Sequence, residues 1–170
     1  MLRTLVNLQR VEPGFNMRNL LLFRIQPGMI GYKDEKLEQL YQQIAERLEA
    51  VPGVRAVTFS DVPVLAQWSN ASDVYLRNDL AAAPDSEGRI KPSGPSYVLH
   101  VRENFLEAIE IPLLSGRSLQ ARDDTRAPKV AVVNQTFANK YFPYENPVGK
   151  RFTFSSSKKL DEIEIIGRHQ

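Results

Sequence analysis

The sequence contains no cysteine among its 170 residues and only two histidines, His100 and His169. A chain without cysteine can form neither a disulfide scaffold nor a thiolate metal site. Two histidines make a histidine-rich metal centre nearly impossible. A lack of cysteine fits many bacterial proteins, but it does not fix the cellular compartment.

Long apolar runs are also missing. No segment approaches the roughly 18 uncharged apolar residues that a membrane span requires. The first residues, from Met1 to Val6, lack the apolar core of a signal peptide. We therefore expect this stretch of chain to be soluble as it stands.

The composition of the chain is that of an ordinary globular protein. Hydrophobic residues make up 42% and charged residues 25% of the chain, which is enough to bury a core. The length predicts one domain, with room for an inserted subdomain. Because the formal net charge is only +2, no concentrated basic face is indicated, and we expect no nucleic-acid partner.

The first part of the chain predicts a β-α-β unit. The apolar run "NLLLFRIQP" (Asn19–Pro27) ends at a proline and is typical of a buried strand. A helix over Asp34–Val51 follows, because apolar residues recur at helical spacing until Pro52 ends the pattern. The expected buried stripe of this helix consists of Leu37, Leu40, Tyr41, Ile44, Leu48 and Val51. The segment Val54–Ser60 then alternates like a second strand.

Residues 61–95 differ in character, and we call them the insertion segment. Prolines and glycines interrupt this stretch, and only "SDVYLRN" (Ser72–Asn78) has the pattern of a strand. Near its start, Val64, Leu65 and Trp68 form an apolar group. Two interpretations of Trp68 stay open: local packing in a small satellite cluster, or an anchor in a contact with another protein.

Strand and helix patterns return after the insertion segment. "SYVLHV" (Ser96–Val101) alternates as a strand, and a short helix pattern follows it. Val130–Val133 predicts a buried strand, followed by a helix with Asn134 as its N-cap. In that helix Phe137 and Tyr141 stand one turn apart, and we expect both to face the sheet. "KRFTF" and "EIEIIG" predict two closing strands joined by a polar hairpin connection.

Two short motifs suggest chemistry, but neither is complete. Gly149-Lys150 resembles the end of a phosphate loop, yet the preceding spacing is wrong and Arg151 stands where Ser or Thr is needed. A turn in which Gly149 supplies a positive φ before a strand is the better interpretation. "SSSK" (Ser155–Lys158) has the S-x-x-K spacing of penicillin-recognising enzymes, but their partner elements do not follow it.

The acidic pair Asp123-Asp124 is the remaining candidate for metal chemistry. Two adjacent carboxylates on a loop do not supply the six or more oxygens that a hard cation takes, so a solvated loop is favoured. With no catalytic constellation in the sequence, we expect a non-catalytic chain with no cofactor and no metal.

Four stretches, in this order and at these separations, resemble one known family. They are "LQRVEPGFNMRNLLLFRI", "RLEAVPGVRAVTFSDVPVL", "VRENFLEAIEIPLLSGRSL" and "VAVVNQTFANKYFPYENPVGKRF", the last followed by "EIEIIG". Together they are similar to the MacB-like periplasmic core domain of FtsX-like ABC transporter permeases. The elongated permeases common in acidobacteria are the most similar form. The resemblance runs from Leu2 to Gly167 and is weakest between Gln67 and Pro95.

The resemblance implies a mixed α/β (α+β) fold with two lobes on the outer side of a membrane. A porter-like core of β-α-β units would comprise residues 19–60 and 96–170, and residues 61–95 would form a variable inserted lobe. Residues 1–18 would be a stub after the first transmembrane helix, so the full-length parent would be membrane-anchored. Gln170 would then be a cut in a longer chain.

The resemblance also implies a function. In the family, ATP hydrolysis in a cytoplasmic ATPase moves the membrane helices, and these drive the periplasmic domains of a dimer. This chain would therefore couple ATP hydrolysis to mechanical work or to export of a macrolide, peptide or lipoprotein, in the periplasm outside the inner membrane. Its partners would be a second permease subunit or dimer mate, the ATPase reached through the membrane helices and, in some systems, a periplasmic adaptor.

Within this reading, Val64, Leu65 and Trp68 are the residues that we expect at a contact with a partner or cargo. A free-standing soluble α/β domain that binds a peptide or small ligand remains the alternative. An intact soluble protein ending at Gln170 would favour that alternative. An enzyme ranks below both, since the sequence offers no nucleophile or metal set.

Overall fold

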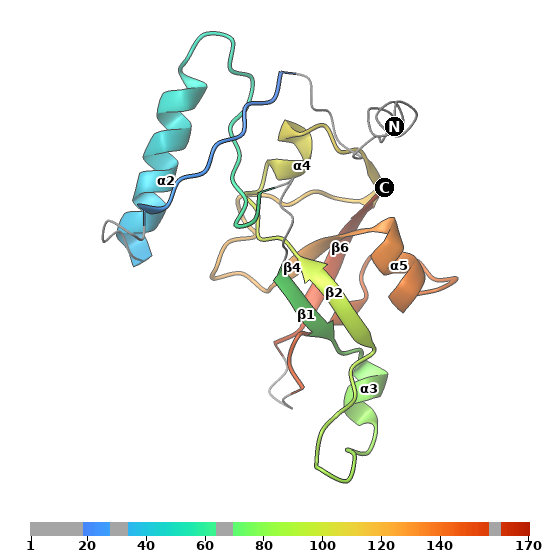
Figure 1. The fold of residues 1–170 in the computed structure, drawn as a ribbon. Coiled ribbons are helices and arrows are strands. Elements are labelled where there is room, and N and C mark those ends of the chain that lie inside the picture. Colours follow the sequence, from blue (N-terminus) through green and yellow to red (C-terminus); the bar gives the residue numbers. More distant parts are fainter. Residues whose placement is uncertain (1–18, 28–33, 64–69, 157–160) are drawn as a thin grey trace, which may run out of the picture.

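The computed structural model describes residues 19–27, 34–63, 70–156 and 161–170 (Figure 1). In chain order the elements are α2 (Asp34–Glu49), β1 (Asn70–Val74), α3 (Arg77–Ala81), β2 (Gly94–Val98), α4 (Phe105–Ala108), β3 (Leu113–Gly116), β4 (Val130–Asn134), α5 (Gln135–Tyr141), β5 (Arg151–Phe152) and β6 (Ile163–His169). Helices and strands are interspersed along the chain, which confirms the predicted mixed α/β class.

The larger sheet is built around β6. Its strand order is β3-β6-β4, and β5 also pairs with β6. β4 runs parallel to β6, whereas β3 and β5 run antiparallel to it. The chain passes from β4 to the parallel β6 through α5, so this part of the molecule contains a β-α-β crossover.

Helix α5 covers one face of this sheet and supplies much of the core. Phe137 and Tyr141 are both buried, as predicted, and their ring centroids lie 4.6 Å apart. Phe137 also stands 5.1 Å from the ring of Phe152 on β5. The buried cluster consists of Val74, Val133, Phe137, Tyr141, Phe152 and Ile165.

A second cluster packs around α4. Phe105, Leu106 and Ile109 are buried there against Leu113 and Val132. Val132 belongs to this cluster, while its neighbour on β4 belongs to the α5 cluster. Because successive residues of a strand point to opposite faces, the two clusters lie on opposite faces of the larger sheet.

Asn134 ends β4 and caps α5, as predicted from the sequence. Its Oδ1 accepts a hydrogen bond from the backbone N–H of Phe137 at 2.8 Å. We expect Asn134→Ala to lower the free energy of unfolding by about 1 kcal/mol, because that N–H loses its acceptor. Asn134→Asp keeps an acceptor and should lose much less. Urea denaturation measures both, and equal losses for the two variants would contradict the cap.

The ribbon of β1 and β2 is joined to the larger sheet. β1 and β2 pair antiparallel, from Asn70 opposite Val98 to Val74 opposite Gly94. Immediately after β1, Tyr75 exchanges two backbone hydrogen bonds with Thr153, of 2.9 and 3.0 Å. In Figure 1 the ribbon lies beside the larger sheet, with α3 and the loop after it at the far end from α2. One end of the insertion segment is therefore held by the sheet.

The predicted β-α-β unit around α2 is wrong. The helix forms, but Asn19–Pro27 forms no strand, although Figure 1 shows this segment running alongside α2. In Val54–Ser60 only Ser60 pairs, through an isolated bridge to Val101. A strand exists only through its ladder with a neighbour, and beyond that single bridge the described residues form no ladder with either segment.

The side chains around α2 are also less buried than predicted. Ala45 is buried at 1% exposure, but the expected stripe of Leu37, Leu40, Tyr41, Ile44 and Leu48 is only half-buried. Val51 is 48% exposed, and on the neighbouring segment Leu21 is 80% and Phe23 58% exposed. The apolar pattern is amphipathic as expected, but the described residues cover only part of it.

Two shorter elements also differ from the prediction. The expected strand over Ser72–Asn78 is β1, which ends at Val74, followed by helix α3. The carboxylate of Asp79 explains the change, because it accepts the backbone N–H of Leu76 at 2.7 Å and so caps the helix start. The segment Leu113–Gly116, for which no strand was predicted from the sequence, forms β3.

Candidate functional site

The predicted contact residues Val64, Leu65 and Trp68 lie outside the described residues, so their role stays a prediction. The residues on either side of that stretch are described. Val62 is buried at 5% exposure, and Asn70 begins β1.

Asp61 joins three parts of the chain at the base of the insertion segment. Its Oδ1 accepts the backbone N–H of His100 at 2.9 Å, and its Oδ2 lies 2.8 Å from the Nδ1 atom of the same residue. The Nδ2 atom of Asn70 donates to Oδ2 at 3.0 Å. Residues 61 and 70, which flank the predicted contact residues, are therefore held together directly.

The Asp61–His100 pair has a structural role, because it joins two distant parts of the chain. Partial burial raises the pKa of Asp61, but hydrogen bonds from the ring and backbone of His100 outweigh it, so the net pKa lies below its ordinary value. The ionised carboxylate only accepts, so the His100 Nδ1 atom carries the proton in this contact. The hydroxyl of the nearby Ser60 donates to the carbonyl of Val62 at 2.7 Å.

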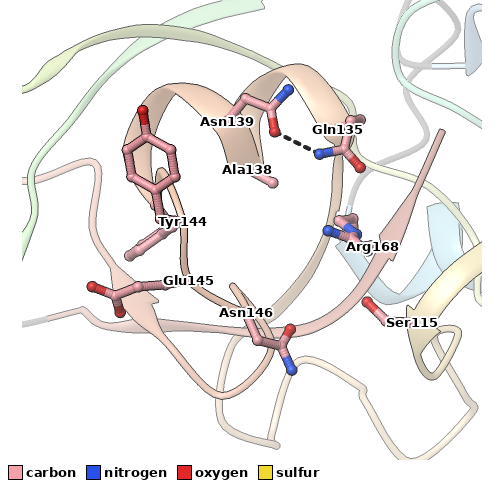
Figure 2. Close-up of a pocket in the computed structure, with 9 residues that line it drawn as sticks. Ser115, Gln135, Ala138, Asn139, Tyr144, Glu145, Asn146 and Arg168 are labelled. Atoms are coloured by element: carbon pink, nitrogen blue, oxygen red, sulfur yellow. Dashed lines mark hydrogen bonds between the residues drawn. The ribbon is translucent and has the colours of Figure 1, made fainter.

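A pocket of about 430 Å³ lies between α5, the turn after it, and the ends of β3 and β6 (Figure 2). Its polar lining includes Ser115, Gln135, Asn139, Glu145, Asn146 and Arg168. Two lining atoms, Arg168 Nε and Ser115 Oγ, are buried and have no hydrogen-bond partner among the described residues. No motif in the sequence indicates this pocket. The available signals were an arginine at the end of a closing strand and an aromatic residue in a proline-flanked turn.

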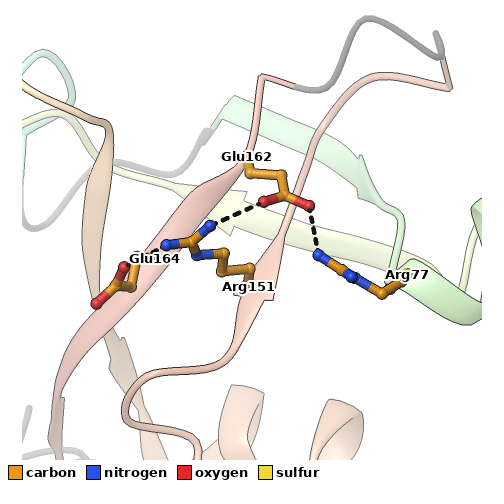
Figure 3. Close-up of polar contacts among 4 residues, drawn as sticks. All are labelled: Arg77, Arg151, Glu162 and Glu164. Carbon is orange, nitrogen blue, oxygen red and sulfur yellow. Dashed lines mark hydrogen bonds and ion pairs between the residues drawn. The ribbon is translucent and has the colours of Figure 1, made fainter.

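Four charged residues link α3 to β5 and β6 (Figure 3). Arg151 donates to Glu162 at 3.2 Å and to Glu164 at 3.1 Å, and Arg77 reaches the other oxygen of Glu162 at 3.3 Å. Hydrogen bonds to Glu164 and Glu162 raise the pKa of Arg151 above its usual value. Solvent and salt screen these exposed pairs, so they orient α3 relative to β5 and β6 more than they stabilise the fold.

The turn interpretation of Gly149-Lys150 is confirmed. Gly149 has φ +85°, and its N–H donates to the carbonyl of Ile165 at 2.8 Å. The Lys150 ammonium pairs with the carboxylate of Glu145. These contacts form a turn that leads into β5. Of the S-x-x-K motif, Lys158 lies outside the described residues.

The expectation of a solvated acidic loop is wrong for Asp123. Its side chain is 7% exposed, and it forms two hydrogen bonds with the guanidinium of Arg117, at 2.6 and 2.8 Å. Hydrogen bonding to the Arg117 side chain holds the pKa of Asp123 below its ordinary value against the opposing effect of burial. Asp124 pairs instead with Arg126 at 2.6 Å. The two adjacent carboxylates therefore form ion pairs with two different arginines.

Two further properties hold for the described part of the chain. No three histidine or acidic side chains there gather into a group that could hold a metal ion. None of the helices in the same residues is both long enough and apolar enough to cross a membrane.

The comparison with protein families gives one match. The family model for the MacB-like periplasmic core domain matches residues 7–169, which is almost the whole chain. The comparison with curated proteins gives no match.

Several solved structures resemble the fold, including the following two. The periplasmic region of MacB from Actinobacillus actinomycetemcomitans is 19% identical, with a TM-score of 0.53 over 75% of this chain and 49% of that one. A domain of a proposed permease from Porphyromonas gingivalis is 20% identical, with a TM-score of 0.52 over 74% and 48%. At such identities the likeness establishes the fold alone. The chain spans about half the length of each structure.

Proposed function

This chain belongs to the family of MacB-like periplasmic core domains, and from that premise we propose that it couples cytoplasmic ATP hydrolysis to mechanical work or export outside the membrane. Domains of this family are the periplasmic parts of ABC-type transporter permeases, so the chain lies on the outer side of the cell membrane. The observation that carries the proposal is the family match, which runs from residue 7 to residue 169.

The connection between the two lobes supports a mechanical role. The insertion segment and the larger sheet share the backbone pair of Tyr75 and Thr153, and the Tyr141 hydroxyl donates to the Pro95 carbonyl at 2.8 Å. A lobe attached through a flexible hinge would not follow a displacement of the membrane helices, whereas a lobe held at several points moves with them.

The proposal extends to the parent protein. Residues 1–18 would follow its first transmembrane helix, residues 19–60 and 96–170 would form the porter-like core, and residues 61–95 would form the inserted lobe. Its partners would be a second permease subunit or dimer mate, the ATPase and, in some systems, a periplasmic adaptor, with macrolide, peptide or lipoprotein as the cargo class. ATP hydrolysis would reside in a separate domain or subunit, and this domain would have no catalytic group or cofactor of its own.

The decisive test is the parent reading frame and its neighbours. We expect apolar segments of about 20 residues on both sides of this domain, and an ATPase gene beside or fused to it. A reading frame that encodes no such segments would overturn the proposal. It would favour the alternative, a free-standing soluble α/β domain that binds a peptide or small ligand.

Val64, Leu65 and Trp68 remain the proposed contact residues. We expect Trp68→Ala to lower transport by the parent protein several-fold, as the loss of about 1–2 kcal/mol at a contact predicts. The same change should alter the domain's free energy of unfolding by less than about 0.5 kcal/mol, as for a surface substitution. A transport assay and calorimetry of the isolated domain provide the two measurements.

The control for Trp68→Ala is Phe23→Ala, which removes another aromatic side chain, one that is 58% exposed. Transport should be nearly unchanged in this variant. If Trp68→Ala instead abolishes the unfolding transition of the isolated domain, Trp68 packs in a local cluster and the contact role is wrong.

A further inference from the structure

The pocket in Figure 2 contains a positive charge that the described residues leave unpaired. The Nε atom of Arg168 is buried and has no hydrogen-bond partner among them, and the same holds for the hydroxyl oxygen of Ser115. Both residues line the pocket from neighbouring strands, where they stand opposite each other in the β3–β6 register. Buried donors without acceptors are unfavourable in a folded protein. Both groups are therefore available to a hydrogen-bond acceptor on a ligand.

Two irregularities of the sheet turn these side chains toward α5. Ile166 has no counterpart on β4, and Leu114 has none on β6. A single extra residue in a strand reverses the face on which the following side chains lie. Arg168 therefore lies on the α5 side of β6 with Ile165, although it is three residues further along the chain. Bulges at such positions redirect individual side chains, and here they redirect the arginine into the pocket.

The rest of the lining adds neutral donors. On α5 the Gln135 amide nitrogen donates to the Asn139 Oδ1 atom at 2.6 Å, which leaves the Asn139 nitrogen as a donor. Asn146 accepts the backbone N–H of Val148 through its Oδ1 atom, so its amide nitrogen is likewise a donor. The one carboxylate of the lining, Glu145, is neutralised by Lys150. The lining therefore favours an acceptor with negative charge.

Tyr144 forms the opposite side of the pocket. Figure 2 shows its side chain across the pocket from Arg168. The residue is fully exposed and has φ +67°, a left-handed conformation that tyrosine rarely adopts. Strained residues of this kind cluster at ligand sites. An exposed aromatic ring next to a pocket is also a typical anchor for a bound chain.

We propose that this pocket binds a carboxylate carried by a peptide, with Arg168 and Ser115 holding the carboxylate and Tyr144 packing against the peptide's neighbouring side chain. A single arginine among neutral donors fits a monovalent carboxylate, whereas a divalent phosphate would call for further cations. A small free carboxylate would reach Arg168 but leave Tyr144 in water, so a ligand that spans both is favoured. The site uses only described residues and does not depend on the transport role.

The test uses the 170-residue chain and defined probes. Two-dimensional NMR titration would compare the capped tripeptide Ala-Glu-Phe with its counterpart Ala-Gln-Phe, and with acetyl-Ala-Ala-Phe that has a free C-terminal carboxylate. We expect the glutamate or the C-terminal probe to shift the signals of Ser115, Asn139 and Arg168. Whichever probe binds better identifies the source of the carboxylate. The glutamine peptide should bind at least about tenfold more weakly, as the loss of a charged hydrogen bond predicts.

Variants separate the two halves of the site. Arg168→Met should weaken binding of the acidic probe by about tenfold or more, and Arg168→Lys by less. Tyr144→Ala should weaken binding of the acidic peptide but leave the weak binding of acetate unchanged. Arg126→Met is the matched control, because Arg126 is 89% exposed, pairs with Asp124 and does not line the pocket.

Several results would overturn the proposal. They are equal affinity for the glutamate and glutamine peptides, unchanged binding in a folded Arg168→Met variant, or no binding of any acidic probe at millimolar concentration. Tighter binding of inorganic phosphate than of acetate would replace the carboxylate assignment. If Arg168→Met does not fold, the comparison of glutamate with glutamine on the unmodified chain still decides.

Discussion

Replacing Gly116 by alanine is expected to destabilise the domain by about 3 kcal/mol, which is a large share of the 5–15 kcal/mol typical of a folded domain. A Cβ atom on Gly116 would lie 2.2 Å from the carbonyl oxygen of Ile166 and 2.7 Å from the Cα atom of Gly167. Both are backbone atoms of β6, so no side-chain rotation can relieve the clash. β3 would have to move away from the central strand of the sheet.

Backbone conformation adds to this effect. Gly116 has φ +78°, a region that costs an ordinary residue about 1–2 kcal/mol. The hydrogen bond from the Arg117 N–H to the Ile166 carbonyl, 2.8 Å long, would also be strained as β3 shifts. For a chain of this length, a loss of about 3 kcal/mol corresponds to a fall in melting temperature of roughly 6–12 °C. Calorimetry or urea denaturation measures the change.

Two other glycines separate the causes. Gly149 has φ +85° but open space around its missing Cβ, so Gly149→Ala should cost only the conformational part, about 1–2 kcal/mol. Gly167 does not adopt a positive φ, but a Cβ atom on it would lie 2.4 Å from the Arg117 carbonyl oxygen, so Gly167→Ala tests the clash alone. If Gly116→Ala costs no more than Gly149→Ala, the close approach of β3 to β6 does not limit stability.

The elements predicted correctly are those whose signals are local. The stretch from Val130 to Phe152 contains four local signals: a β-branched run, an asparagine cap, two aromatic residues one turn apart and a glycine turn. The structure confirms each of them, because capping, helical periodicity and a positive φ are decided within a few residues. Local interactions alone were enough to predict the structure of this part of the larger sheet.

The errors occurred where structure depends on distant partners. "NLLLFRIQP" has the composition of a buried strand, but a strand also needs a ladder, and composition does not say whether one is present. Asp123 was assigned to solvent because Arg117, its partner, stands six residues earlier beyond a strand end. In both cases the sequence shows the apolar or charged character of the residues. It does not show which distant residues they pair with.

The pocket was missed for a related reason. Alternation along "EIEIIG" places Ile165 and Arg168 on opposite faces, and this is what a regular strand would do. The extra residue at Ile166 reverses that relation, and nothing in the sequence marks its position. A site that depends on a bulge is therefore visible only once the register of the sheet is known.

The second large effect is expected at Val74. This residue lies in the insertion segment, yet its side chain is fully buried in the core between α5 and the larger sheet. Val74→Ala should lower the free energy of unfolding by about 2–3 kcal/mol, because it leaves a cavity that the surrounding aromatic rings cannot fill. Val54→Ala is the matched control, since Val54 is 38% exposed, and it should cost less than about 0.5 kcal/mol.

The same variant tests whether the insertion segment folds as a separate lobe. Trp68 is the only tryptophan and belongs to that segment, so its fluorescence follows the segment, while far-UV circular dichroism follows the whole domain. Because Val74 belongs to the main core, we expect Val74→Ala to shift both transitions together to lower urea. A shift in the fluorescence transition alone would mean that the segment unfolds by itself. In that case the contacts between Tyr75 and Thr153 would be too weak to couple the unfolding of the insertion segment to that of the core.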